Sequence, residues 1–414
     1  MRRYEGPVEC NSAYQFGYFN FGDRVLMSLR DPFFDLPPNS EWNACIGRQG
    51  DEENYVDGYI EAAIELSSAV LEKSMYEKRD TLVLPILYNA RHAIELTLKL
   101  VIAKFVEAGI LNKGHPQNHD ISSHWQFIDD NAIPDELFRN LLFGLSPYVR
   151  SLSQIDNDGQ QLRFHRDRDG RRSMEEKALA NIAVIAESLK ELQKVLHDLK
   201  HRAYSLCDEW RTGTRTNYCS RRDLVEIAKV LPERREWGSE AFAECKKIII
   251  ERFDLSSRQF NLALKKIEGT RGLSRLIGLE SQLVHLTDSQ AKFLIVEWEK
   301  LHPPRDTNFG VGFDYPNDRD WEKIQERLGK EAVVLSNIIS ELSEDEFADA
   351  KTIYYLARDR AYPELYEKRL ELKKAEFNAR GDYRREVHDL MGKTNFRHLF
   401  VEGLRQLGRI NFSA

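Results

Sequence analysis

The sequence has few cysteines and no long hydrophobic run. Its five cysteines, at positions 10, 45, 207, 219 and 245, form no C-x-x-C pair, and cysteines scattered through a long chain favour reduced thiols over a disulfide framework. No stretch approaches the ~20 consecutive apolar residues that a membrane-spanning helix needs. The first residues, MRRYEGPVEC, lack the apolar segment of a signal peptide. We therefore expect a cytoplasmic protein without a membrane partner.

The chain also lacks an excess of positive charge and the common enzyme motifs. A formal net charge of −7 argues against a protein that coats nucleic acid with its whole surface, so any such contact requires a local basic patch. The motifs G-x-x-x-x-G-K-[ST], strand-led G-x-G-x-x-G, G-x-S-x-G and H-E-x-x-H do not occur. The signatures of P-loop hydrolases, dinucleotide-binding enzymes, serine hydrolases and zincins are therefore missing. Nothing in the sequence predicts a cofactor.

What is present is helical periodicity in a composition typical of globular proteins. The 414 residues are 42% hydrophobic and 31% charged, and this length exceeds the usual ceiling for a single core. We expect an all-α fold with an irregular N-terminal collar (1–50), a four-helix domain (51–203) and a mainly helical C-terminal domain (204–414). The expected helices span residues 55–77, 82–107, 134–146, 174–199, 223–231, 257–268, 288–301, 321–341, 343–358, 362–378, 383–391 and 395–407.

The stretch LVLPILYNARHAIELTLKLVIAKF, residues 82–105, organises the first half. Its apolar residues recur every three or four positions, which predicts a buried helix face. On another face Arg91, Glu95 and Lys99 follow one another at single turns, with His92 beside them, so opposite charges can pair. The simplest interpretation is a solvated ion-pair stripe. The alternative is a polar site inside a helical bundle, where each charge needs a partner.

Three further segments carry distinctive chemistry or patterning. Between Ile182 and Leu199, apolar residues alternate at steps of three and four, a heptad seam that must pack on other helices. His115, His119 and His124 lie close together, but H-x3-H-x4-H matches no compact ligand spacing, so we expect no metal site. Residues 163 to 172 contain five arginines and two aspartates, and we expect this segment to be a loop or a tight hairpin. Such guanidinium groups bind phosphate well, although a merely solvated loop is the plainer alternative.

Three motifs in order suggest a family. RHAIELTLK (91–99), HDISSHW (119–125) and LRFHRDRDG (162–170), followed by a long helix, resemble a HEPN-like pattern in uncharacterised bacterial proteins. In that pattern "R-H-x-x-E-L-x-L-K", "H-D-x-x-x-L" and "L-R-Y-P-x-D-x-x-G" segments recur, and His165 stands in place of the proline. The resemblance covers about residues 50–200. It implies a helical bundle from a defence or stress-response system that forms homo-oligomers, with RNA as a partner.

Many HEPN proteins cleave RNA through an R-x(4–6)-H motif, but no histidine of this chain has an arginine at that spacing. The resemblance therefore favours a sensor or regulator that binds RNA or a nucleotide-type ligand. An alternative is an unconventional, metal-independent endoribonuclease, in which arginine holds phosphate and imidazole exchanges protons. A third possibility is a structural scaffold, with a protein partner on the C-terminal region. The candidate catalytic residues are Arg91, His92, Glu95 and His119. The candidate ligand-binding residues are Lys99, Arg163, His165, Arg166 and Arg168.

Overall fold

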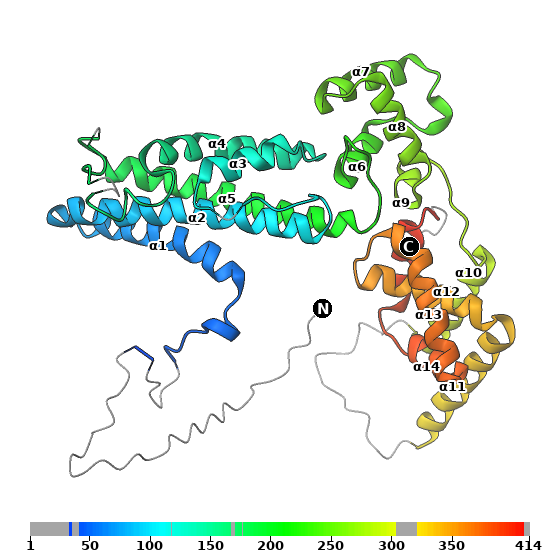
Figure 1. Cartoon of the computed structure of the whole chain (residues 1–414). Coiled ribbons are helices and arrows are strands. Elements are labelled where there is room, and N and C mark those ends of the chain that lie inside the picture. The colour runs from blue at the N-terminus through cyan, green and yellow to red at the C-terminus, as the bar shows by residue number, and fades with distance from the viewer. Residues whose placement is uncertain are drawn as a thin grey trace, which may run out of the picture. The chain divides into compact units, whose positions relative to one another are not determined.

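The computed structural model describes residues 33–34, 41–116, 118–166, 170–175, 177–303 and 321–409 (Figure 1). The chain divides into two compact units, residues 1–52 and 53–414. Most of the expected N-terminal collar lies outside the described residues, as do Arg168 and most of the Pro/Gly-bearing segment after residue 303.

The described residues confirm the all-α prediction. Their regular structure is helical, apart from one isolated antiparallel bridge between Arg166 and Arg172. No helix among them is long and apolar enough to cross a bilayer. The α-helices are α1 (Glu52–Glu72), α2 (Arg79–Glu107), α3 (Ile121–Asp130), α4 (Glu136–Asp156), α5 (Ile182–Trp210), α6 (Arg221–Val230), α7 (Glu240–Phe253), α8 (Ser257–Glu268), α9 (Arg271–Ser274), α10 (Asp288–Leu301), α11 (Trp321–Glu341), α12 (Glu344–Arg358), α13 (Tyr366–Arg380), α14 (Tyr383–Met391) and α15 (Phe396–Gln406).

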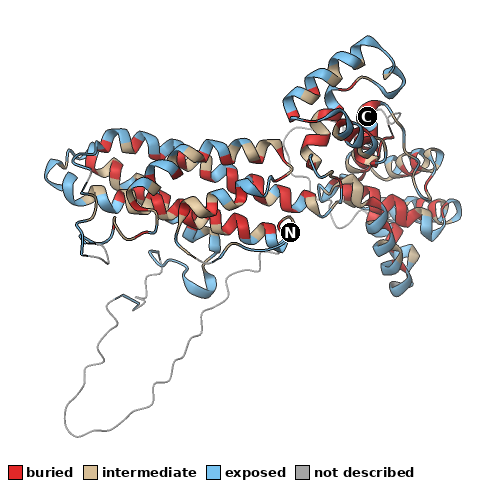
Figure 2. Cartoon of the chain, turned by 45° about the horizontal axis from the view of Figure 1, so that its top comes forward, coloured by how far each residue is buried: buried red, intermediate tan, exposed pale blue. Residues whose placement is uncertain are grey.

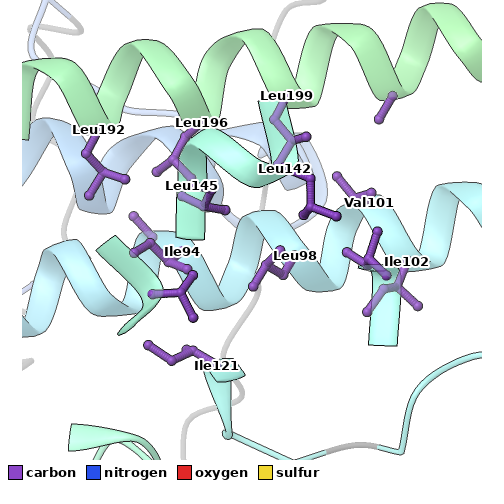
Figure 3. Packing of buried hydrophobic residues seen from close by; sticks show 14 of the residues in the cluster. Ile94, Leu98, Val101, Ile102, Ile121, Leu142, Leu145, Leu192, Leu196 and Leu199 are labelled. Carbon is purple, nitrogen blue, oxygen red and sulfur yellow. The ribbon is translucent and has the colours of Figure 1, made fainter. Parts of the chain in front are cut away.

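The first hydrophobic cluster is formed by residues from each of the five helices α1, α2, α3, α4 and α5. Helix α2 supplies the largest share, and α5 packs on both α2 and α4 while α3 packs on α2 and α4. Figure 3 shows the contact, with Ile94 and Leu98 of α2 facing Leu196 of α5. The heptad seam of α5 is thus buried within the chain, as Figure 2 shows for the inner faces of the long helices. The prediction that this seam packs on other helices is confirmed.

Local chemistry explains where these helices begin and end. Helix α2 starts at Arg79, three residues before its predicted start at residue 82, and Pro85 lies inside the helix. Because proline has no N–H, position 85 donates no hydrogen bond to the carbonyl of Thr81, which is an exposed residue. Helix α5 starts later than predicted because the Asn181 side chain accepts hydrogen bonds from the amides of residues 183 and 184. It then continues to Trp210, past the expected boundary at residue 204.

Helix α3 was not predicted, so the bundle has five helices rather than four. The Asp120 carboxylate caps α3 by accepting a hydrogen bond from the Ser123 amide. Helix α4 begins just after Asp135, which caps Phe138, and runs ten residues beyond its predicted end, through Pro147, to Asp156. These two helices place their adjoining ends, residues 119–120 and 156–157, beside the middle of α2.

Two further hydrophobic clusters fill the second half. One lies among α6, α7, α8 and α9, between Cys219 and Ile277, and includes the unpredicted helix α7. The other gathers α10 to α15 between Leu286 and Leu407, with α12 packed on α13 and α15. The division into domains at 51–203 and 204–414 stays a prediction.

Candidate functional site

Helix α2 and the turn before α3 bring five of the predicted residues together. Arg91, His92, Glu95 and Lys99 come from α2, and His119 comes from the residue before the α3 cap. The spacing of three and four residues along α2 places the first four on one side of the helix, and His119 completes the group from a segment 24 residues further along the chain. We call these five residues the Glu95 cluster.

The Glu95 carboxylate is the centre of this cluster. One oxygen accepts hydrogen bonds from Lys99 Nζ at 2.6 Å and from His119 Nδ1 at 2.8 Å. The other accepts one from Arg91 at 2.7 Å, and His92 Nδ1 lies 3.6 Å away. Glu95 itself is only 1% exposed. Both oxygens are therefore occupied by the chain's own donors.

The charge state of Glu95 follows from these contacts. Burial by itself raises the pKa of this carboxyl group, but hydrogen bonds from His92, Lys99, Arg91 and His119 together outweigh burial. The net result is a pKa well below the usual range of a glutamate. Glu95 is therefore an anion at every physiological pH, and it orients its donors without exchanging protons itself.

Arg91 is a buried connector. Its guanidinium is 1% exposed and donates to the Asp156 carbonyl at 2.8 Å, the Asn157 carbonyl at 2.8 Å and the His119 carbonyl, besides Glu95. The interpretation of a solvated ion-pair stripe is therefore wrong for Arg91 and Glu95, because α3 and α4 cover them. These contacts join the C-terminal end of α4 to the turn that precedes α3. A phosphate in solvent has no access to this guanidinium.

The backbone around Arg91 is equally constrained. Gly159 has a φ of +78°, and a Cβ at this position would lie 3.1 Å from an Arg91 nitrogen, so both the conformation and the close contact favour glycine. The Asp156 carboxylate accepts hydrogen bonds from the amides of Gln160, Gln161 and Leu162 at 2.7 to 3.1 Å. This turn fixes the start of the arginine-rich segment next to the Glu95 cluster.

The other histidines have different roles. The His119 side chain is 66% exposed, so the ring that Glu95 holds through Nδ1 has its far side in solvent. Asp120 does not pair with His119, because its carboxylate caps α3. His124 is buried, and burial lowers the pKa of its imidazole. Its ring packs against His115, with centroids 4.5 Å apart, and no group of three or more metal-ligating side chains occurs among the described residues.

The arginine-rich segment is a hairpin, one of the two predicted forms. Arg166 and Arg172 form the antiparallel bridge, and the Ser173 amide donates to the His165 carbonyl at 3.0 Å. The side chains of Arg163, His165 and Arg166 are exposed. The Arg163 guanidinium lies 5.8 Å from the Tyr88 ring centroid, and the Tyr88 ring stacks on His92 at 5.6 Å. This stack connects the hairpin to the Glu95 cluster.

A pocket of about 1040 Å³ is lined in part by the hairpin. Its lining comes from the end of α1, the first turns of α2 and residues 161–183, and includes Arg79, Arg172 and Lys177. Arg172 belongs to the arginine-rich segment that the sequence singles out, but sequence reasoning did not group it with Arg79 and Lys177, because Arg79 comes from the distant start of α2 and no local spacing connects the three. Of the predicted ligand-binding residues that the structure describes, Arg163 and His165 line this pocket, and Lys99 and Arg166 do not.

The Glu95 cluster presents cationic and imidazole groups to solvent, and the buried Glu95 carboxylate holds them in place. Lys99 is 34% exposed, and His92 and His119 also reach solvent. Such groups suit an anionic ligand, and an imidazole held by a carboxylate suits proton transfer. Comparison of the chain with protein-family models, with curated proteins and with solved structures finds no match.

Proposed function

We propose that this chain is a HEPN-like sensor or regulator that binds RNA, or a nucleotide-type ligand, across the Glu95 cluster and the arginine hairpin. The observation that carries the proposal is the stack that places the exposed Arg163 guanidinium over Tyr88 and Tyr88 over His92, next to Lys99 and His119. Guanidinium and ammonium groups supply phosphate contacts, and the outer face of an exposed guanidinium supplies base stacking. The chain offers both within one local surface.

Burial assigns different parts to the residues within this proposal. Arg91 and Glu95 position the others, because their polar atoms are taken up by the chain. Lys99, His92, His119 and the hairpin arginines are the groups that contact a ligand. Because the whole protein carries a net charge of −7, an anion is attracted to this positively charged patch rather than to the rest of the surface. A role in defence or stress response follows from the HEPN resemblance alone.

The test is RNA binding by purified protein. We expect fluorescence anisotropy to show binding of a labelled single-stranded RNA at ~50 mM salt, where electrostatic binding is strong. The double variant Lys99→Ala, Arg163→Ala should weaken this binding roughly tenfold or more, which corresponds to about 1.4 kcal/mol. Lys247→Ala, which removes an exposed lysine from α7, is the matched control and should bind as the wild type does. Absence of binding by the wild type at low salt contradicts the proposal.

One observation favours endoribonuclease activity as a second candidate. His119 is held at Nδ1 by Glu95 at 2.8 Å while most of its ring is exposed, and a carboxylate that fixes the imidazole in this way leaves Nε2 for acid or base work. We expect cleavage of a single-stranded RNA in the presence of EDTA to be abolished by His119→Ala and retained by His115→Ala. If the wild type binds RNA and leaves it intact, the sensor function stands and the nuclease is excluded.

A further inference from the structure

The pocket beside the hairpin combines an aliphatic wall with an exposed apolar rim. Val70, Leu87 and Ile182 line it from three different helices. Around the opening, five large apolar side chains are exposed, one of them, Leu179, to 96%. The exposed rim residues are Leu71, Tyr76, Leu84, Phe164 and Leu179. A gathered set of exposed apolar side chains, as opposed to scattered single ones, is typical of a surface that a partner covers.

The described residues that line the same pocket carry more positive than negative charge. Four cations line it, and among the described residues none of them forms an ion pair with a carboxylate: Arg79, Arg163, Arg172 and Lys177. Two carboxylates, Asp80 and Glu175, also belong to the lining. Among the described lining residues, cations therefore outnumber carboxylates four to two. Helices α2 and α5 both begin at this pocket, where the positive ends of their dipoles add to the field.

The chemistry of the wall selects among ligand classes. Ten of the 26 described lining residues are leucine, valine, isoleucine or methionine, so a nucleobase, which stacks on aromatic and guanidinium faces, would leave this aliphatic surface uncovered. An acyl chain requires an enclosed cavity, and a rim as exposed as Leu179 and Tyr76 would leave it wet. A protein segment can cover both wall and rim, because aliphatic side chains enter the pocket while flanking carboxylates meet the cations.

We propose that this pocket is a docking site for an acidic protein segment that presents aliphatic side chains between aspartates or glutamates. Leu84 on α2 and Leu179 before α5 provide exposed apolar contacts. Arg79 of α2 and Lys177 of the segment that follows the hairpin provide the charge contacts. This site shares the hairpin with the proposed RNA surface, through Arg163, His165 and Arg172, whereas no residue of the Glu95 cluster lines the pocket.

The experiment is a selection from a displayed library of random peptides about twelve residues long, with the full-length chain as bait. We expect the enriched peptides to carry aspartate or glutamate flanking leucine, isoleucine, valine or methionine. Synthetic copies should bind the wild type and lose at least tenfold in affinity for Leu84→Asp. The matched control is Leu372→Asp, which places the same charge at an exposed leucine on α13 and should bind as the wild type does.

A charge exchange sharpens the test. Lys177→Glu should weaken binding of the acidic peptide, and a peptide in which one acid is replaced by lysine should recover affinity for this variant only. Enrichment of basic peptides, or equal affinity of the acidic peptide for the wild type and Leu84→Asp, overturns the proposal. If Leu84→Asp reduces RNA affinity while peptides bind unchanged, the pocket binds nucleic acid and the proposal is likewise overturned. The two sites are distinct if the double variant Lys99→Ala, Arg163→Ala loses RNA binding while the single variant Lys99→Ala still binds the peptide.

Discussion

Glu95 is a buried carboxylate that holds two cations and two imidazoles, so its removal tests what the cluster contributes to stability. Glu95→Ala leaves the Arg91 guanidinium buried with its main ionic partner gone and releases Lys99. We expect the free energy of unfolding to fall by about 3 kcal/mol or more, the usual cost of breaking a buried ion pair by removing one partner. Chemical denaturation at neutral pH measures this change.

The same helix provides the control for this substitution. Glu107 forms an exposed pair with Lys104 at 3.5 Å, with the Glu107 side chain 70% exposed. Glu107→Ala should cost less than about 0.5 kcal/mol, because exposed pairs contribute little. Equal effects of the two substitutions would show that Glu95 is as weakly coupled to the fold as a surface glutamate.

At this scale the sequence predicts the charged stripe but not its burial. The spacing of Arg91, Glu95 and Lys99 is enough to predict their pairing along α2. The further partners of Arg91 are the backbone carbonyls of His119, Asp156 and Asn157. Every residue type carries a carbonyl, so no side-chain pattern indicates these contacts. Whether the stripe faced solvent or the bundle therefore depended on where α3 and α4 pack.

At the scale of elements, periodicity predicts the long helices well and the short ones poorly. The seam from Ile182 to Leu199 is regular over several turns, and the structure buries it as predicted. Helix α3 is ten residues long and opens in the histidine-rich stretch, where polar residues hide the period. The pocket was invisible for a different reason: its walls come from α1, α2 and the hairpin segment, and only packing unites them.

The junction between α4, α5 and α6 gives a prediction about pH. The Arg202 guanidinium pairs with Asp135 and Glu209, and the Asp223 carboxyl group is close enough to Asp135 to feel its charge. Asp223 instead accepts hydrogen bonds from the amides of Ser220 and Glu136. Burial, and then the nearby charge of Asp135, raise the pKa of Asp223 to about 7. Folding therefore favours the protonated form of Asp223.

The direction of the pH effect follows from this raised pKa. Because the folded chain holds a proton that the unfolded chain releases at lower pH, the contribution of Asp223 to stability is fully present in acid and is lost as pH rises through about 7. Asp223→Asn removes this ionisation, so its melting temperature relative to the wild type should increase between about pH 4 and 7, the interval between the unfolded and folded pKa values of Asp223, and level off at higher pH. Asp208→Asn, an exposed residue paired with Arg211, should show no such trend. A constant difference for Asp223→Asn across this range would contradict the raised pKa.

At the scale of the whole molecule, two features bear on assembly and charge. The heptad seam is used inside the chain, against α2 and α4, so it offers no surface to a second copy. The prediction that the chain forms homo-oligomers is therefore supported only by the HEPN resemblance, and it stays a prediction. The net charge of −7 repels polyanions in general, so RNA binding must come from the local patch alone.

A local patch implies few phosphate contacts and therefore a shallow salt dependence. If Lys99, Arg163 and Arg166 each neutralise one phosphate, the logarithm of RNA affinity should fall with the logarithm of salt at a slope of roughly −2, because single strands release ~0.7 counterions per contact. Arg163→Ala with Arg166→Ala should reduce the slope to roughly −0.7. The melting temperature should change little, since both side chains are exposed. A steep slope near −5 in the wild type would instead indicate a surface much larger than this patch. Unfolding of the double variant would assign the hairpin arginines to the fold, as clamps on the turn that Asp156 holds.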